Sequence, residues 1–165
     1  YPLPEAQMDR FLMHVMVDYP APHTEQLILE LSRQETLKTA SETIAKVDKA
    51  TLFSAREQVL QVHMSAPVEA YLVQIILATR NSNDYGGDLA DWLDYGASPR
   101  ATIALDRCSR ALAWLDNRDY VTPDDVRSVA HDILRHRLIL SFEAEAAGVS
   151  ANSVIDLLLR TVPSA

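Results

Sequence analysis

The chain contains very little glycine and almost no cysteine. Only 4 of its 165 residues are glycine, which argues against a loop-rich or mostly β architecture and leaves little material for a glycine-rich nucleotide cradle. Cys108 is the single cysteine, so neither an internal disulfide nor a cysteine-based zinc site is possible, a usage that fits a reducing cytoplasm. No apolar run approaches the roughly 20 residues that a membrane span requires.

Several chemical motifs are also missing. The sequence has no G-x-x-x-x-G-K-[ST] loop and no apolar strand that ends in paired acids, so this chain alone is expected neither to bind nor to hydrolyse ATP. His131 and His136 are five positions apart and do not share a helical face, and no metal site is predicted. No signal-peptide pattern occurs, and the chain opens on Tyr1 rather than Met, which suggests a part of a larger protein.

The charge balance argues against nucleic-acid binding. The net charge is −8, from 15 basic and 23 acidic side chains, and such a surface repels phosphate backbones. Basic residues cluster only weakly, at Arg135-His136-Arg137. The composition is otherwise ordinary for a globular domain, with 48% hydrophobic residues.

The first 53 residues predict a strand and a connector. Residues 11–17 read FLMHVMV, an apolar run typical of a strand that is covered on both faces, and its sheet is expected to lie upstream. Prolines then break the pattern, and Thr24 is expected to cap a helix. Residues 34–52 are polar and are interpreted as a connector that contains some helix.

Helical patterns dominate residues 54–165. Start signals for helices stand at Ser54-x-x-Glu57, a capping box, and at Ser98-Pro99 and Thr122-Pro123, where a cap precedes proline. Further helices are predicted over the apolar stripe 68–79 and from about Asn152. Residues 81–96 are interpreted as a loop with a short turn at 89–93, and residues 138–142 as either a helix end or a short strand. The predicted fold class is therefore mainly α: a helical bundle preceded by an α/β remnant.

Two arginines are candidates for binding phosphate. Arg100 follows Ser98-Pro99 at the start of a helix, where exposed amides and a guanidinium together suit an anion. Arg10 lies where the predicted strand begins, and strand ends often border ligand clefts or subunit interfaces. The alternative for each is an internal ion pair, in which Arg100 would bind Asp94 or Asp91, and Arg10 would bind Asp9 or Glu5.

Four blocks of sequence resemble the MoxR family of AAA+ ATPases, in the family's order along nearly the whole chain. They are YPLPEAQMDRFLM at 1–13, GASPRA at 96–101, NRDYVTPDDV at 117–126, where Asn117 replaces the family's usual glycine, and LRHRLILS at 134–141. The resemblance implies an AAA+ lid domain that is a helical bundle over 54–165. It further implies a remnant of the ATPase core with its last strand at 1–18, joined through a connector at 19–53.

The resemblance also implies roles and partners. Arg10 matches the family's arginine finger, which reaches the γ-phosphate of ATP on a neighbouring subunit, and Arg100 matches its sensor-2 arginine. The full-length protein would be a cytoplasmic, Mg²⁺-dependent ATPase that assembles as a ring, usually a hexamer. It would remodel or mature protein complexes, often beside von Willebrand factor A domain proteins.

Two other functions compete with this one. A helical protein-interaction module would use the same arginines only in structural pairs. A DNA-binding helical domain is disfavoured by Asp124, Asp125 and Asp132 on the helix that would read the DNA. Acidic residues in the 81–95 loop could bind a partner or simply be solvated.

Overall fold

A computed structural model describes residues 3–37 and 45–164 of the chain. It forms two units, one composed of Tyr1–Val15 with Ala55–Ala165 and the other of Met16–Ser54. The first is called the helical unit below. Part of the predicted connector, 38–44, lies outside the described residues.

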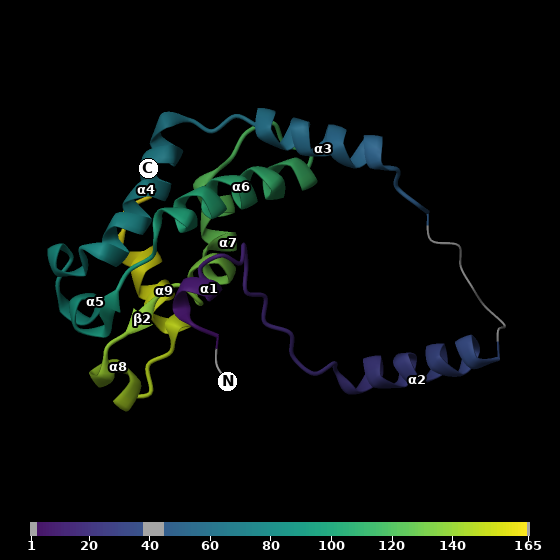
Figure 1. Ribbon diagram of the computed structural model, residues 1–165, viewed down its shortest axis with the longest axis horizontal. Helices are drawn as coiled ribbons and strands as arrows, with labels where there is room; N and C mark the ends of the chain where they lie inside the picture. The colour runs from purple at the N-terminus through teal and green to yellow at the C-terminus, as the bar shows by residue number, and fades with distance from the viewer. Residues whose placement is uncertain (1–2, 38–44, 165) are drawn as a thin grey trace. The chain divides into compact units, whose positions relative to one another are not determined.

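The fold is mainly α, as predicted, and its one sheet has two short strands within the described part of the chain (Figure 1). The longer helices are α2 (Pro22–Thr36), α3 (Lys49–Gln61), α4 (Ala66–Arg80), α6 (Pro99–Leu115), α7 (Pro123–Leu134) and α9 (Ala151–Thr161). The short elements are α1 (Glu5–Met8), η1 (Ser82–Asp84), α5 (Gly87–Trp92), β1 (Leu93–Tyr95), β2 (Ile139–Leu140) and α8 (Phe142–Ala146).

Helices α4, α6, α7 and α9 enclose the hydrophobic core of the helical unit, with α6 and α7 side by side (Figure 1). The fully buried side chains are aliphatic and recur at helical spacing, which is what drives amphipathic helices together. The largest of them are Leu72, Ile75, Ile76, Leu89, Leu105, Ile133, Leu134, Ile155 and Leu158. Leu115, the last residue of α6, is 68% exposed.

The starts of α6 and α7 are where the cap-proline signals predict them. The side chain of Ser98 accepts a hydrogen bond from the Arg100 amide, 3.2 Å away. At α7, Thr122 and Asp125 form a capping box in which each side chain accepts from the other's backbone amide. Both helices have proline in their first turn, where its missing N–H costs nothing.

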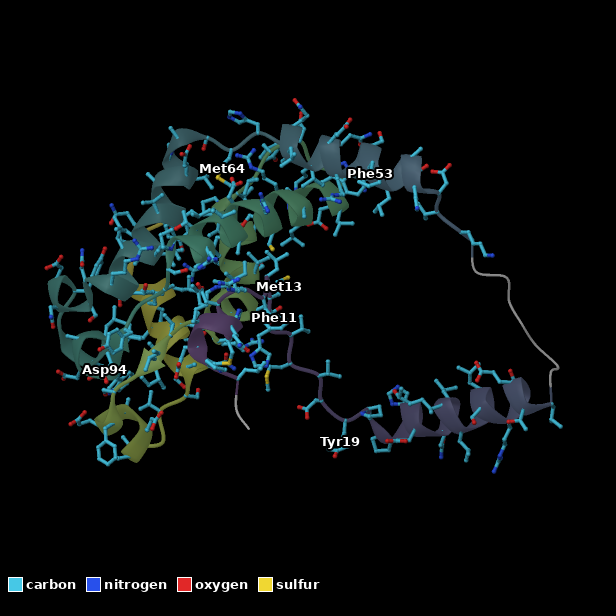
Figure 2. All side chains as sticks on the ribbon, in the orientation of Figure 1. Phe11, Met13, Tyr19, Phe53, Met64 and Asp94 are labelled. Atoms are coloured by element: carbon cyan, nitrogen blue, oxygen red, sulfur yellow. The ribbon has the colours of Figure 1, made fainter. Side chains whose placement is uncertain are left out.

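Residues 81–96 carry more regular structure than the predicted loop. They form η1, α5 and β1, and β1 pairs antiparallel with β2, Leu93 opposite Leu140. The second strand also decides the open question at 138–142, because Ile139–Leu140 is extended and α8 begins two residues later. Leu89 and Leu93 of this region are buried in the core, whereas the acidic side chains, Asp94 among them (Figure 2), are exposed.

Residues 11–17 form no strand within the described part of the chain, which does not contain the upstream sheet that the prediction assigned to them. These residues are irregular, and their amide contacts go to helices instead: the His14 amide donates to the carbonyl of Asp132 on α7, 2.7 Å away. A strand requires a neighbouring strand to pair with, and the described residues offer this segment none. Met13, which lies near Phe11 in Figure 2, packs on the core of the helical unit.

Two predicted helix starts are also wrong. Helix α2 begins at Pro22 with Ala21 before it, so Thr24 lies inside the first turn and is not the cap. Helix α3 begins at Lys49, five residues before Ser54. The carboxylate of Asp48 accepts from the Thr51 amide at 2.7 Å, so the aspartate provides the N-terminal contact that was assigned to Ser54.

Candidate functional site: a carboxylate shared by two arginines

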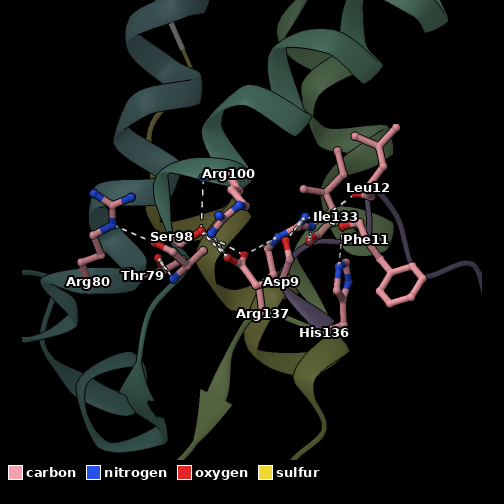
Figure 3. A network of polar contacts seen from close by, with 11 residues as sticks. Asp9, Phe11, Leu12, Thr79, Arg80, Ser98, Arg100, Ile133, His136 and Arg137 are labelled. Carbon is pink, nitrogen blue, oxygen red and sulfur yellow. Dashed lines mark hydrogen bonds and ion pairs between the residues drawn. The ribbon is translucent and has the colours of Figure 1, made fainter. Parts of the chain in front are cut away.

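The side chain of Asp9 is the centre of a polar network at the edge of the helical unit (Figure 3). Asp9 follows the last residue of α1, and its carboxylate accepts from the Ser98 hydroxyl at 2.9 Å to each oxygen. It also accepts from Arg100 Nη1 and from Arg137 Nε, each at 3.1 Å. One carboxylate thereby joins the N-terminal segment to the start of α6 and to the residues that follow α7.

Arg137 is the buried member of the network. Its side chain is 2% exposed, and its guanidinium donates to Asp9 and to main-chain carbonyls. The acceptors are the carbonyls of Asp9 at 3.1 Å, Phe11 at 2.5 Å, Leu12 at 3.3 Å and Ile133 at 2.5 Å. A guanidinium has five N–H donors, and a buried one is tolerated only when such acceptors surround it. Arg137 therefore fixes the main chain on both sides of Arg10.

The two residues before Arg137 bind the same segment. Arg135 Nη1 donates to the His14 carbonyl at 2.5 Å and pairs with Asp132 at 2.6 Å. His136 Nε2 lies 3.3 Å from the Phe11 carbonyl, and its ring meets that of His14 edge-on at 5.9 Å. The weak basic cluster at 135–137 thus binds residues 9–14 of the same chain.

Arg100 forms an ion pair, but with neither of the predicted partners. The alternatives considered were Asp91 and Asp94, both in the preceding loop, whereas the pair observed is with Asp9, 91 positions away. The Arg100 side chain is 58% exposed, so its guanidinium faces solvent as well as Asp9. A pair this exposed contributes little to stability.

Arg10 is exposed and, among residues 3–37 and 45–164, has no ion-pair partner. The predicted alternative, a pair with Asp9 or Glu5, is not observed. Asp9 is instead occupied by Ser98, Arg100 and Arg137.

The start of α6 is held against α4 by contacts that require glycine at position 96. A Cβ there would lie 2.2 Å from the Thr79 carbonyl oxygen, well inside van der Waals contact. The next residue, Ala97, donates its amide to the Thr79 hydroxyl at 3.0 Å and accepts from Arg80 Nε at 2.7 Å. These contacts place Ser98 and Arg100 opposite Asp9.

Electrostatics keep Asp9 ionised. Burial raises the pKa of this carboxyl, but hydrogen bonds from Ser98, Arg100 and Arg137 outweigh burial and hold the pKa below its ordinary 3.8. At His136 burial acts in the opposite sense: together with the nearby charge of Arg137 it lowers the pKa of the imidazole below 6.5. The site therefore combines a firmly anionic Asp9 with a neutral His136 near pH 7.

An open pocket of about 300 Å³ adjoins the network. Residues from α1, from the β1 end and from 135–139 line it, among them Asp9, Ser98 and Arg137. In the described part of the chain no cluster of three histidine, cysteine or acidic side chains could hold a metal ion. No described helix is both long and apolar enough to cross a membrane.

The sequence alone indicated Arg10 and Arg100 but not the two residues that connect them in space, Asp9 and Arg137. Asp9 was considered only as a possible partner of Arg10, and Arg137 only as part of a basic cluster. The usable signal was that both lie in the blocks of family resemblance, at 1–13 and 134–141.

The helical unit has the fold of an AAA+ lid: residues 90–158 match the family model described as the AAA lid domain. The chain is 38% identical over 163 residues to the protein named Chaperone MoxR1 of Mycobacterium tuberculosis, covering 98% of this chain and 42% of the relative. It is 32% identical over 177 residues to Protein MoxR of Paracoccus denitrificans, covering 99% and 51%.

A solved structure agrees. The crystal structure of a candidate ATPase from Cytophaga hutchinsonii matches with a TM-score of 0.91 and 40% identity, covering 100% of this chain and 50% of that one. The chain is similar over nearly its whole length to MoxR proteins of the AAA+ class, and it spans about half the length of the relatives that it matches.

Proposed function

We propose that this chain is the lid-bearing part of a longer ATPase that couples ATP binding and hydrolysis to the remodelling or maturation of protein complexes. One observation carries the proposal: Asp9, the residue next to Arg10, accepts a hydrogen bond from the guanidinium of Arg100. Of the two cations suited to phosphate, Arg100 belongs to this network through an exposed pair, and Arg10 adjoins it with no ion pair among the described residues.

Arg10 is proposed to act on ATP held by a neighbouring subunit. A guanidinium aimed at the transferred phosphoryl group stabilises the charge that develops on its oxygens, and such arginines contribute roughly 10³–10⁵ in rate. The geometry supports this role because Arg137 holds the carbonyls of Asp9 and Phe11, on either side of Arg10. The main chain is fixed while the Arg10 side chain stays exposed.

Arg100 is proposed to contact the phosphates of the nucleotide from the start of α6. The helix supplies a partial positive charge at that end, and the guanidinium adds a full one. A nucleotide bound to Arg100 would act as a ligand that favours one orientation of the lid, which is a rigid-body movement.

ATP and Mg²⁺ are proposed to be held by parts of the full-length protein outside this chain. We further propose a homo-oligomeric ring of six subunits, located in the cytoplasm. A relative named a chaperone supports the remodelling role, and von Willebrand factor A domain proteins are the proposed partners.

The proposal is tested in the full-length protein with three variants. Arg10→Ala is expected to reduce ATP turnover by about 10³ or more while nucleotide binding stays within about twofold of wild type. Arg100→Ala is expected to weaken both nucleotide affinity and turnover. Arg107→Ala is the matched control, because it removes an exposed arginine of the same helix, one that makes no ion pair within the described residues.

Wild-type turnover in both Arg10→Ala and Arg100→Ala would overturn the proposal. That result would favour the competing function, a helical interaction module in which these arginines are structural. Turnover and affinity are measured by steady-state phosphate release and by titration of a fluorescent ATP analogue.

A further inference from the structure

Asp9 has one permanent partner and one that can be exchanged. The side chain of Arg137 is 2% exposed, whereas the side chain of Arg100 is 58% exposed. Removing a partner from a buried pair leaves an uncompensated charge, so the buried pair persists. The exposed pair competes with water and with other anions, so it is the one that a ligand can replace.

The permanent partner acts on the main chain of the segment that carries Arg10. Arg137 binds the carbonyls of Asp9, Phe11 and Leu12 and the Asp9 carboxylate. The exchangeable partner, Arg100, reaches the same carboxylate from the start of α6 (Figure 3). The two contacts together determine where residues 9–12 lie relative to the start of α6 and the end of α7.

We infer that Asp9 is a positioning residue that couples Arg100 to Arg10. When a nucleotide phosphate binds the Arg100 guanidinium, Asp9 loses its exchangeable partner, and residues 9–12 remain held by Arg137, Ser98 and His136. The phosphate state sensed at α6 thereby changes the restraint on Arg10, one residue away from the shared carboxylate. This inference rests on the proposed function, because it takes the anion to be the phosphate of a nucleotide.

The restraint itself is tested without nucleotide, by amide hydrogen exchange in the full-length protein. Arg100→Ala removes the exchangeable partner, so the amides of Phe11 to His14 are expected to exchange about two- to fivefold faster, the range that an exposed ion pair supports. The His14 amide is the most direct reporter, because it donates to the Asp132 carbonyl when the segment is docked. Arg107→Ala is the matched control and is expected to leave these rates unchanged.

The link to catalysis is tested with Asp9→Asn, which removes the charge and keeps the shape. With Arg100 no longer drawn to a carboxylate and Arg10 less well positioned, kcat is expected to fall about tenfold while KM for ATP stays the same or decreases. Asp9→Glu keeps a carboxylate and is expected to recover part of the lost kcat. A lesion that only weakened the fold would lower the melting temperature and not produce this split.

The outcomes separate the inference from the proposed function. If Arg10→Ala and Arg100→Ala lose turnover while Asp9→Asn keeps wild-type kcat and KM, the ATPase proposal stands and the coupling is wrong. If Arg10→Ala and Arg100→Ala both keep wild-type turnover, the ATPase proposal itself fails. If Asp9→Asn does not fold, the exchange experiment decides, and unchanged rates in Arg100→Ala overturn the coupling.

Discussion

Arg137 and Asp9 are 128 positions apart in the chain and form an ion pair, with 3.1 Å between Nε and Oδ1. The arginine side chain is almost wholly buried, and the aspartate lies beside the proposed finger Arg10. The pair therefore connects the end of α7 to the segment that the account assigns to catalysis.

Removing Arg137 is expected to undock residues 9–14. In Arg137→Ala, the carbonyls of Asp9, Phe11 and Leu12 lose their buried donor, and the segment keeps the packing of Met13 and its contacts with Arg135 and His136. The His14 amide should exchange at least about tenfold faster, because loss of a buried charged partner costs more than 1.4 kcal/mol. Native-state hydrogen exchange measures this rate, and an unchanged rate for His14 would show that Arg137 does not hold the segment.

A second buried carboxylate, Asp125, is expected to be a major source of stability for α7. It is 5% exposed, accepts from Arg118 Nη1 at 2.8 Å and Nη2 at 2.6 Å, and completes the capping box with Thr122. Asp125→Ala should lower the free energy of unfolding by about 2–3 kcal/mol, from the lost cap and the lost bidentate pair with Arg118. Urea denaturation measures it. Asp124→Ala, an exposed neighbour, is the control and should cost less than about 0.5 kcal/mol.

Asp125 is also expected to make the free energy of unfolding fall in acid. Burial raises the pKa of Asp125, but hydrogen bonds from Arg118 and Thr122 outweigh it and hold the pKa below 3.8. The unfolded state then binds a proton more readily, so this contribution is complete above the ordinary value and is lost as pH falls through the folded pKa. Unfolding measured between pH 7 and pH 3 should show a shallower acid loss in Asp125→Asn than in wild type. Parallel curves would contradict this prediction.

His136 is expected to make the docking of residues 9–14 depend on pH, in a higher pH range than Asp125 affects. Burial, with the charge of Arg137, lowers the pKa of this imidazole, and its Nδ1 is buried without a hydrogen-bond partner in the described structure. The folded state favours the neutral ring, so docking of residues 9–14 should weaken as pH falls below 6.5. An NMR titration of the His136 ring is expected to give a midpoint below 6.5. A midpoint above that value would contradict the burial argument.

Gly96 is expected to tolerate no side chain. Gly96→Ala would place a methyl group 2.2 Å from the Thr79 carbonyl oxygen, so the backbone before Ser98 must move. The expected cost is about 1–3 kcal/mol, as for an overpacked core, together with weaker docking of Asp9. Gly87→Ala is the comparison, because its Cβ meets nothing within 4 Å and only its φ of +57° is unfavourable. Thermal unfolding should show a larger loss for position 96, and equal losses would contradict the steric argument.

Local signals made part of this fold predictable from sequence. Ser98-Pro99 and Thr122-Pro123 combine a side-chain cap with a proline, and both mark true helix starts because the cap and the helix are contiguous in sequence. Ser54 failed as a start because Asp48, six residues earlier, already supplies a cap. The apolar run 11–17 is irregular because a strand depends on a partner, and the sheet predicted to pair with this run is not among the described residues.

The site was predictable only in part for a related reason. Arg10 and Arg100 stand in motifs that can be read locally. Arg137 acquires its role from a contact that spans 128 positions, and no periodicity or spacing indicates such a contact. Asp9 was visible as a neighbour of Arg10, but its pairing with Arg100 and Arg137 joins segments that are far apart in sequence, which no local pattern specifies.

The most direct test of the account is the ATP turnover of full-length Arg10→Ala, measured beside wild type and Arg107→Ala. Turnover is expected to fall by about 10³ or more while ATP binding is retained, because the missing group stabilises charge in the transition state. Turnover equal to that of Arg107→Ala and wild type would contradict it.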